Sequence, residues 1–255
     1  MSGKYFAFIL LILFSILSIQ SCEKDNIPAS VNIRLKQIAN EKPVLLNEWI
    51  YESPAGHPYK IRRLQMLLSD FELHTTNGEI IIYDMYHYFE FSKVEGYNFT
   101  LKDIPVNSYN KIVFNFGLDE EKNQNNAYPN DYDMINFKWP SQMGIGYHYM
   151  RFEVTADSLG SGVIKDFNIH TGATNGNQNY LTFEIPFDET FIQNQNFTID
   201  LIMDMNQWFK DPLIFDWEHY GQGIMGNQEA QSILKNNGHN TFSVEGPFLT
   251  DEYHR

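Results

Sequence analysis

The stretch "NFTIDLIMDM" at residues 196–205 has an apolar side chain at every second position. Successive side chains of an extended strand point to opposite faces, so Phe197, Ile199, Leu201, Met203 and Met205 would share one face. A period of two residues therefore predicts a β-strand with one side against a hydrophobic core.

Similar segments recur through the chain. Apolar residues alternate at 110–119, and runs rich in β-branched and aromatic residues occur at 79–91, 163–170 and 179–186. Turn residues separate these short runs, which is typical of two packed sheets. We therefore predict an all-β fold, a single β-sandwich domain. The run at 59–73 fits neither the helical nor the strand period, and its structure stays open.

One short C-terminal helix is predicted at residues 227–238. Asn227 has the side chain of an N-cap, and Ala230, Ile233 and Leu234 form one apolar stripe. Gly238 is expected to end the helix.

The N-terminus predicts export. Lys4 precedes an apolar run at residues 5–19, which is followed by "IQSC" ending at Cys22. This order is typical of a lipoprotein signal. We expect a signal peptide at 1–21, a lipidated Cys22 with a polar tether at 22–30, and the folded domain at 31–255. The lipid would attach the protein to the outer membrane or cell surface of a Gram-negative bacterium.

Composition and motifs exclude several functions. The formal net charge is −14 and no basic stripe is present, which argues against nucleic-acid binding. Cys22 is the only cysteine, so a lipidated chain has no disulfide and no cysteine nucleophile. Nucleophile-elbow, phosphate-loop and zinc-protease motifs are absent from the sequence, and Asp200 and Asp204 are interpreted as surface charge. We expect no enzymatic activity.

Histidine and methionine pairs suggest a metal site instead. In "MGIGYHYMRFE" at 143–153, strand alternation would place His148, Met150 and Phe152 on one face, and Met85 and His87 repeat this spacing. Imidazole with thioether is a ligand set for copper, particularly Cu(I). For any single histidine, the alternative is an ordinary hydrogen-bonded strand residue. The Asn- and Asp-rich segment 119–133 lacks the spacing of a calcium loop and is interpreted as a solvated connection.

Several segments together resemble a known family. In chain order they are "YKIRRLQMLLSDFEL", "FNFGLD", "FKWPSQMGIGYHYMRFE", "FNIHTG" and "IMGNQEAQSILKNNGHNTFS". This series is similar to the MbnP-like copper-binding domain family, which includes the methanobactin-associated protein and surface copper-binding proteins of methanotrophs. The resemblance implies one β-rich exported domain with a mononuclear copper site held by histidines. In some relatives a tryptophan oxidised to kynurenine joins the site, and a di-haem peroxidase-like partner oxidises it.

The resemblance also implies ligands. His170 matches the histidine of the family's "HIG"-like segment, with Thr171 in the apolar position, and His148 lies in "GYHYM". Met85-Tyr86-His87 is similar to a Trp-x-His pair with methionine in place of tryptophan. The expected metal ligands are therefore His87, His148, His170, Met85 and Met150.

Two tryptophans are candidates for an auxiliary or modified residue. Trp139 in "KWP" matches a recurrent family tryptophan and is either a core residue, which we favour, or the oxidised one. Trp217-Glu218-His219 is the literal Trp-x-His of this chain, without a match in the family pattern.

The sequence thus predicts an exported lipoprotein that binds copper for acquisition, delivery or sensing. Its expected partners are the membrane, through the lipid, and a di-haem peroxidase-like protein. Two alternatives stay open: a surface glycan-binding lipoprotein that uses exposed aromatic residues, and a structural subunit of a surface assembly.

Overall fold

The structure, a computed structural model, describes residues 28–92 and 97–249. One sheet contains β1 (Ala29–Ala39), β2 (Lys42–Pro43), β6 (Asn98–Ile104), β11 (Asn196–Asp204) and β12 (Phe242–Leu249). The other contains β3 (Tyr51–Glu52), β4 (Pro58–Thr75), β5 (Ile80–Glu90), β7 (Asn107–Phe116), β8 (His148–Asp157), β9 (Ile164–Gly172) and β10 (Leu181–Phe191). The helices are α2 (Tyr132–Asn136), α3 (Trp217–Tyr220) and α4 (Gln228–Gly238), with 3-10 turns at Ser158–Gly160 and Met205–Phe209.

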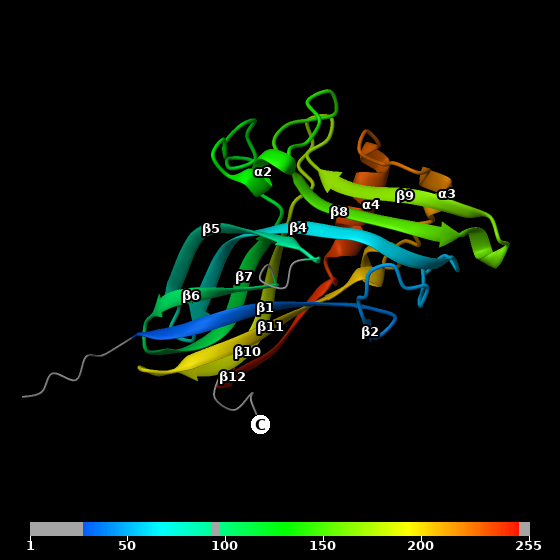
Figure 1. The fold of residues 1–255 in the computed structure, drawn as a ribbon. Helices are drawn as coiled ribbons and strands as arrows, with labels where there is room; N and C mark the ends of the chain where they lie inside the picture. Colours follow the sequence, from blue (N-terminus) through cyan, green and yellow to red (C-terminus); the bar gives the residue numbers. More distant parts are fainter. Residues whose placement is uncertain (1–27, 93–96, 250–255) are drawn as a thin grey trace, which may run out of the picture.

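The two sheets pack face to face, and the helices gather beside β8 and β9 (Figure 1). The five-stranded sheet has the order β12-β11-β1-β2, with β6 also paired to β1. The seven-stranded sheet has the order β10-β7-β4-β8-β9, with β3 and β5 also paired to β4. The predicted all-β sandwich is confirmed. Within the described ranges, every helix falls short of the length and apolarity needed to span a bilayer.

The run at 59–73, ambiguous by sequence, forms most of β4. This strand pairs with β8 along its first half, with β7 along its second half, and with β5 on its other side. Residues 64–69 are all buried, so apolar side chains occupy both faces and the alternation disappears from the sequence. A fully buried strand cannot be recognised by periodicity alone.

Aromatic side chains join the two sheets. The rings of Phe71 on β4 and Phe99 on β6 lie 4.7 Å apart, and those of Phe114 on β7 and Phe242 on β12 lie 5.3 Å apart. Each buried phenylalanine stabilises the fold by roughly 1.5–3 kcal/mol. These contacts define the inner face of the seven-stranded sheet, which looks toward the other sheet. Its opposite side is called the outer face below.

Helix α4 begins as predicted, because the Asn227 side chain accepts a hydrogen bond from the Ala230 amide. Gly238 is the last helical residue, but its role differs from the expected one. A methyl group built there would lie 2.4 Å from Leu181 Cδ1 and 2.5 Å from Trp208 Cζ3. Glycine is therefore needed for close packing of the helix against the core.

Asp200 is not the surface charge expected from the sequence. Its carboxylate is 1% exposed and lies 2.6 Å from Arg34 Nε and 2.5 Å from Lys36 Nζ. Burial alone would raise the pKa of Asp200, but the hydrogen bonds and charges of Arg34 and Lys36 hold it below its ordinary value. This ion pair links the two central parallel strands, β1 and β11.

We expect Asp200→Ala to lower the free energy of unfolding by about 2–4 kcal/mol, because it leaves two cations side by side without their shared carboxylate. Urea denaturation measures the change. Glu184→Ala is the control, since Glu184 pairs with Lys111 on the surface, where ion pairs contribute little. Equal stability of the two variants would contradict a structural role for the Asp200 ion pair.

Candidate metal centre

His148 begins β8 immediately before a β-bulge. His148 pairs with Gly172 on β9, whereas Met150 pairs with Thr171, so Tyr149 is an extra residue in β8. An inserted residue changes which face the preceding side chain points to. The prediction that His148 and Met150 share a face is therefore wrong.

The strand register places His148 and His170 on the outer face. Residues directly opposed in an antiparallel pair share a face, and His170 opposes Arg151, which in turn opposes Gln65. His148 opposes Gly172, two residues from His170, and thus lies on the same side. The two imidazole rings are in contact, with their centroids 5.2 Å apart and their planes at 75°.

The hydrogen bonds of His148 define its tautomer. Its Nδ1 lies 2.9 Å from the carbonyl oxygen of Phe137, which can only accept, so Nδ1 carries the proton. Nε2 then has a lone pair, and this buried atom has no hydrogen-bond partner among the described residues. Burial, together with the nearby Arg151 charge, lowers the pKa of His148 to about 2. The imidazole is therefore neutral across the physiological pH range.

One nitrogen of His170 is likewise held by an acceptor, the Glu153 carboxylate. His170 Nε2 lies 3.2 Å from Glu153 Oε1, and this hydrogen bond together with the Arg63 charge lowers the pKa of Glu153. The ionised carboxylate accepts the Nε2 proton, so the neutral tautomer of His170 has its lone pair on Nδ1. Within the described part of the chain, this buried nitrogen also finds no partner. A histidine held by a carboxylate or a backbone carbonyl is the usual arrangement of a metal ligand.

Trp139 lies beside the two histidines, and His148, His170 and Trp139 are together called the histidine cluster below. Its ring lies 4.8 Å from the His148 ring in an edge-on arrangement, and the side chain is 3% exposed. A methyl group built on Gly172 would lie 2.5 Å from Trp139 Cε3, so the indole packs directly on the backbone of β9. Trp139 is thus buried, as favoured from the sequence, and also lies beside the two histidines.

The other predicted ligands lie elsewhere. His87 on β5 opposes Leu68 and stacks on Phe99 of β6, with ring centroids 4.9 Å apart, so it faces the inner side of the sheet. Met150 is fully buried in the core on that side, and Met85 packs against the core. The structure brings His148 and His170 together and separates them from His87, Met85 and Met150.

Further candidates also lie outside this cluster. Trp217 is fully buried, with its ring 5.1 Å from that of Tyr59, and His219 is exposed on α3. Cys22, the predicted signal and most of the predicted tether lie outside the described residues, and β1 already begins at Ala29. Across the residues that the structure describes, no three His, Cys, Asp or Glu side chains group as a metal site.

Comparison with known proteins identifies the family. The sequence model described as MbnP matches residues 28–226, most of the chain. The chain belongs to the MbnP family. A solved structure, MbnP from Methylosinus trichosporium, is similar at 17% identity and a TM-score of 0.48, over 72% of this chain and 78% of that one. A search of curated proteins gives no match.

In this MbnP-family chain, both histidines were predicted from the sequence, but the groups that accept hydrogen bonds from their rings were not. Glu153 lies within the quoted stretch 143–153, yet only the register between β8 and β9 shows that it approaches His170. The Phe137 carbonyl comes from a connection whose path the sequence does not specify. Gly172 lies two residues after His170 in "HTG". A glycine there could have indicated that another side chain packs closely on the backbone, as Trp139 does.

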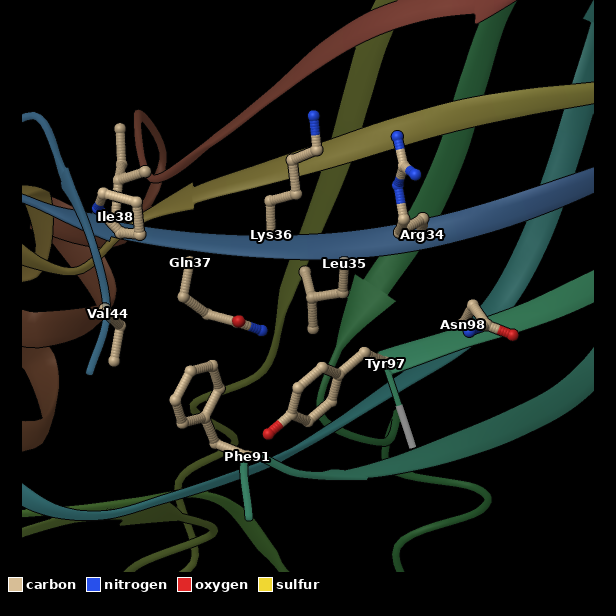
Figure 2. A pocket seen from close by; sticks show the side chains of 10 residues that line it. Arg34, Leu35, Lys36, Gln37, Ile38, Val44, Phe91, Tyr97 and Asn98 are labelled. Carbon is tan, nitrogen blue, oxygen red and sulfur yellow. The ribbon is translucent and has the colours of Figure 1, made fainter. Parts of the chain in front are cut away.

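A separate cavity of about 370 Å³ lies between β1 and residues 91, 97 and 98, which follow β5 and begin β6 (Figure 2). Leu35 and Gln37 point from β1 toward Phe91 and Tyr97, whose rings are stacked 5.1 Å apart. The residues that line this cavity include none of the predicted metal ligands. In this member of the MbnP family, the cavity is thus distinct from the histidine cluster.

Burial of His148 predicts a pH-dependent stability of the metal-free protein. The unfolded histidine binds a proton near its ordinary pKa of 6.5, whereas the folded one does so only near 2. Between about pH 2 and 6.5 the unfolded state therefore binds more protons than the folded state. The contribution of the neutral His148 to the free energy of unfolding is complete above pH 6.5 and falls as the pH is lowered. Between pH 7 and 5, the free energy of unfolding of the wild type should fall by about 2 kcal/mol more than that of His148→Gln.

Urea denaturation at several pH values in the presence of a chelator measures this difference. His219→Gln, at an exposed position of α3, controls for the removal of one histidine. Parallel pH profiles for the wild type and His148→Gln would contradict a neutral, buried His148.

Proposed function

We propose that this protein binds one copper ion through His148 and His170 and acts in copper acquisition, delivery or sensing rather than in catalysis. The observation that carries the proposal is the pair of imidazoles in ring contact, with His148 buried and the His170 side chain 13% exposed. Each has one nitrogen held by an acceptor and the other without a partner in the described chain. Buried polar atoms without partners are costly in a folded protein, and a metal ion would satisfy both.

The chemistry of the two donors favours copper over other biological metals. Calcium and magnesium require several oxygen ligands, and structural zinc sites are almost always four-coordinate. Neutral imidazole suits copper, and Cu(I) is stable with few ligands. The half-buried Arg151 guanidinium lies 3.3 Å from His148 Nδ1 and adds positive charge, which further favours the lower oxidation state. Membership of the MbnP family supports the same assignment.

Trp139 is the proposed auxiliary residue. Of the two candidate tryptophans, Trp139 lies against His148, whereas Trp217 packs among Tyr59 and Phe209. Oxidation of Trp139 to kynurenine by a di-haem peroxidase-like partner is the modification that the family resemblance suggests. His87, Met85 and Met150 are not part of the proposed site, because they lie toward the core or on the inner face.

The proposed location is the outer membrane or cell surface, through a lipid on Cys22. The support is the sequence alone, with its apolar run at 5–19 directly before "IQSC". A copper-binding domain held there would meet copper from outside the cell.

We expect the purified domain to bind one Cu(I) under reducing conditions, and His148→Ala and His170→Ala to weaken binding more than about 100-fold. Losing a ligand should cost at least as much as losing the partner of a ligand, which costs about 10–100-fold. Glu153→Gln, which removes the charge that holds His170, should fall in that lower range. Competition with a chromophoric Cu(I) chelator measures the affinities.

His87→Phe is the matched control, since it keeps an aromatic ring between Phe89 and Phe99. Its affinity should equal that of the wild type, and a loss as large as for His148→Ala would reinstate His87 as a ligand. Unchanged affinity in both His148→Ala and His170→Ala would eliminate the site. Glycan binding, the open alternative, would persist in the presence of a chelator and thus be distinguishable.

Intact-mass spectrometry of the protein purified from membranes should show a chain that starts at a lipidated Cys22. If Trp139 is oxidised, peptide mapping should locate the mass change there and leave Trp217 unmodified. A native chain that retains residues 1–21 would contradict the proposed processing.

A further inference from the structure

The strand that carries His170 is an edge strand. Among the described strands of the seven-stranded sheet, only β8 pairs with β9. Edge strands expose backbone amides and carbonyls, which proteins commonly cover with another segment. Here residues 222–231 run along this edge, beginning with the Asn168 amide, which donates to the Gln222 carbonyl at 2.8 Å.

Gln231 on α4 covers the backbone at His170 itself. Its Nε2 donates to the His170 carbonyl at 2.7 Å, and its Oε1 accepts from the Gly172 amide at 3.4 Å. In a parallel pair of strands, one residue binds a carbonyl of its neighbour and also the amide two residues after that carbonyl. The His170 carbonyl and the Gly172 amide have this spacing. The Gln231 amide thus takes the place of a strand residue, and it is 1% exposed.

A second side chain holds the same stretch. Asn179 Nδ2 donates to the Gly172 carbonyl at 2.7 Å, and Asn179 Oδ1 accepts from Gln228 Nε2 at 3.0 Å. Gly172 opposes His148 and contacts Trp139, so its position affects all three members of the cluster. One turn of α4, from Gln228 to Gln231, therefore holds the outer edge of the proposed centre.

We infer that Gln231 is a positioning residue of the metal centre, which holds the backbone of His170 and Gly172 so that the His170 ring meets His148. The inference rests on the proposed copper site and extends it to a helix beyond the part that matches the family model, which ends at residue 226. Loss of the Gln231 amide would free the edge of β9 and let the two rings separate.

Gln231→Met tests the inference, because it keeps the length of the side chain and removes its hydrogen bonds. Asn237→Leu is the matched control. Asn237 is also a fully buried amide of α4, but it binds the backbone of Trp208 and Leu213 and not β9. Both variants should lower stability, whereas only Gln231→Met should weaken Cu(I) binding, by about tenfold or more. Affinities are measured by chelator competition at a temperature where all variants are folded.

Equal Cu(I) affinities of Gln231→Met and Asn237→Leu would overturn the inference. If Gln231→Met does not fold, Gln231→Glu replaces it. Glutamate keeps the acceptor for Gly172 but places a carboxylate oxygen against the His170 carbonyl, and a wild-type affinity would then overturn the inference.

A metal-free readout separates this inference from the copper proposal. Amide hydrogen exchange at Gly172, and the imidazole nitrogen shifts of His170, should change in Gln231→Met and stay as in wild type in Asn237→Leu. If the wild type binds no copper, the proposed function fails, and these signals alone decide whether Gln231 positions His170. Unchanged signals in Gln231→Met would reject the positioning role.

Discussion

The β-bulge at Tyr149 is the constraint on which the histidine cluster depends. One extra residue in β8 turns His148 away from the core and toward His170. Tyr149 is held there by tertiary contacts: its hydroxyl accepts from Asn123 Nδ2 and donates to Gln178 Oε1. Gly117 supplies the space, because a methyl group on it would lie 2.5 Å from the Tyr149 ring.

The segment between β7 and β8 is the cover of the cluster and not only a connection. Asn123 is fully buried, and its Oδ1 accepts from the Tyr147 amide at 2.9 Å, which fixes the entry into β8. The same segment supplies the Phe137 carbonyl and Trp139. The Asn- and Asp-rich part, interpreted from the sequence as solvated, thus contributes a buried amide. The connection covers His148 on this side and α4 covers the edge of β9, and burial keeps the His148 imidazole neutral.

Several elements could be predicted because their signals are local. The alternation at 110–119 and 196–204 reflects an apolar face on each strand, although polar side chains of the opposite face such as Asn115 and Asp200 are buried as well. The Asn227 cap depends on residues within one helical turn. Long-range features could not be predicted. Asp200 alternates like a surface residue, yet its partners Arg34 and Lys36 come from a strand more than 160 residues earlier. The extent of β4 was hidden for the opposite reason, since burial on both faces removes the periodicity.

For the candidate site, the sequence by itself determined which residues are candidate donors. His148, His170 and Trp139 were recognisable from residue types and from the family resemblance, and the strands that carry two of them from their composition. Only the tertiary structure decided that His148 and His170 meet on one face while His87 lies on the other. The reason is physical: an ideal strand alternates strictly, but the Tyr149 bulge changes that alternation at one place. What stabilises the bulge is packing against Gly117 and Asn123, residues that are distant along the chain.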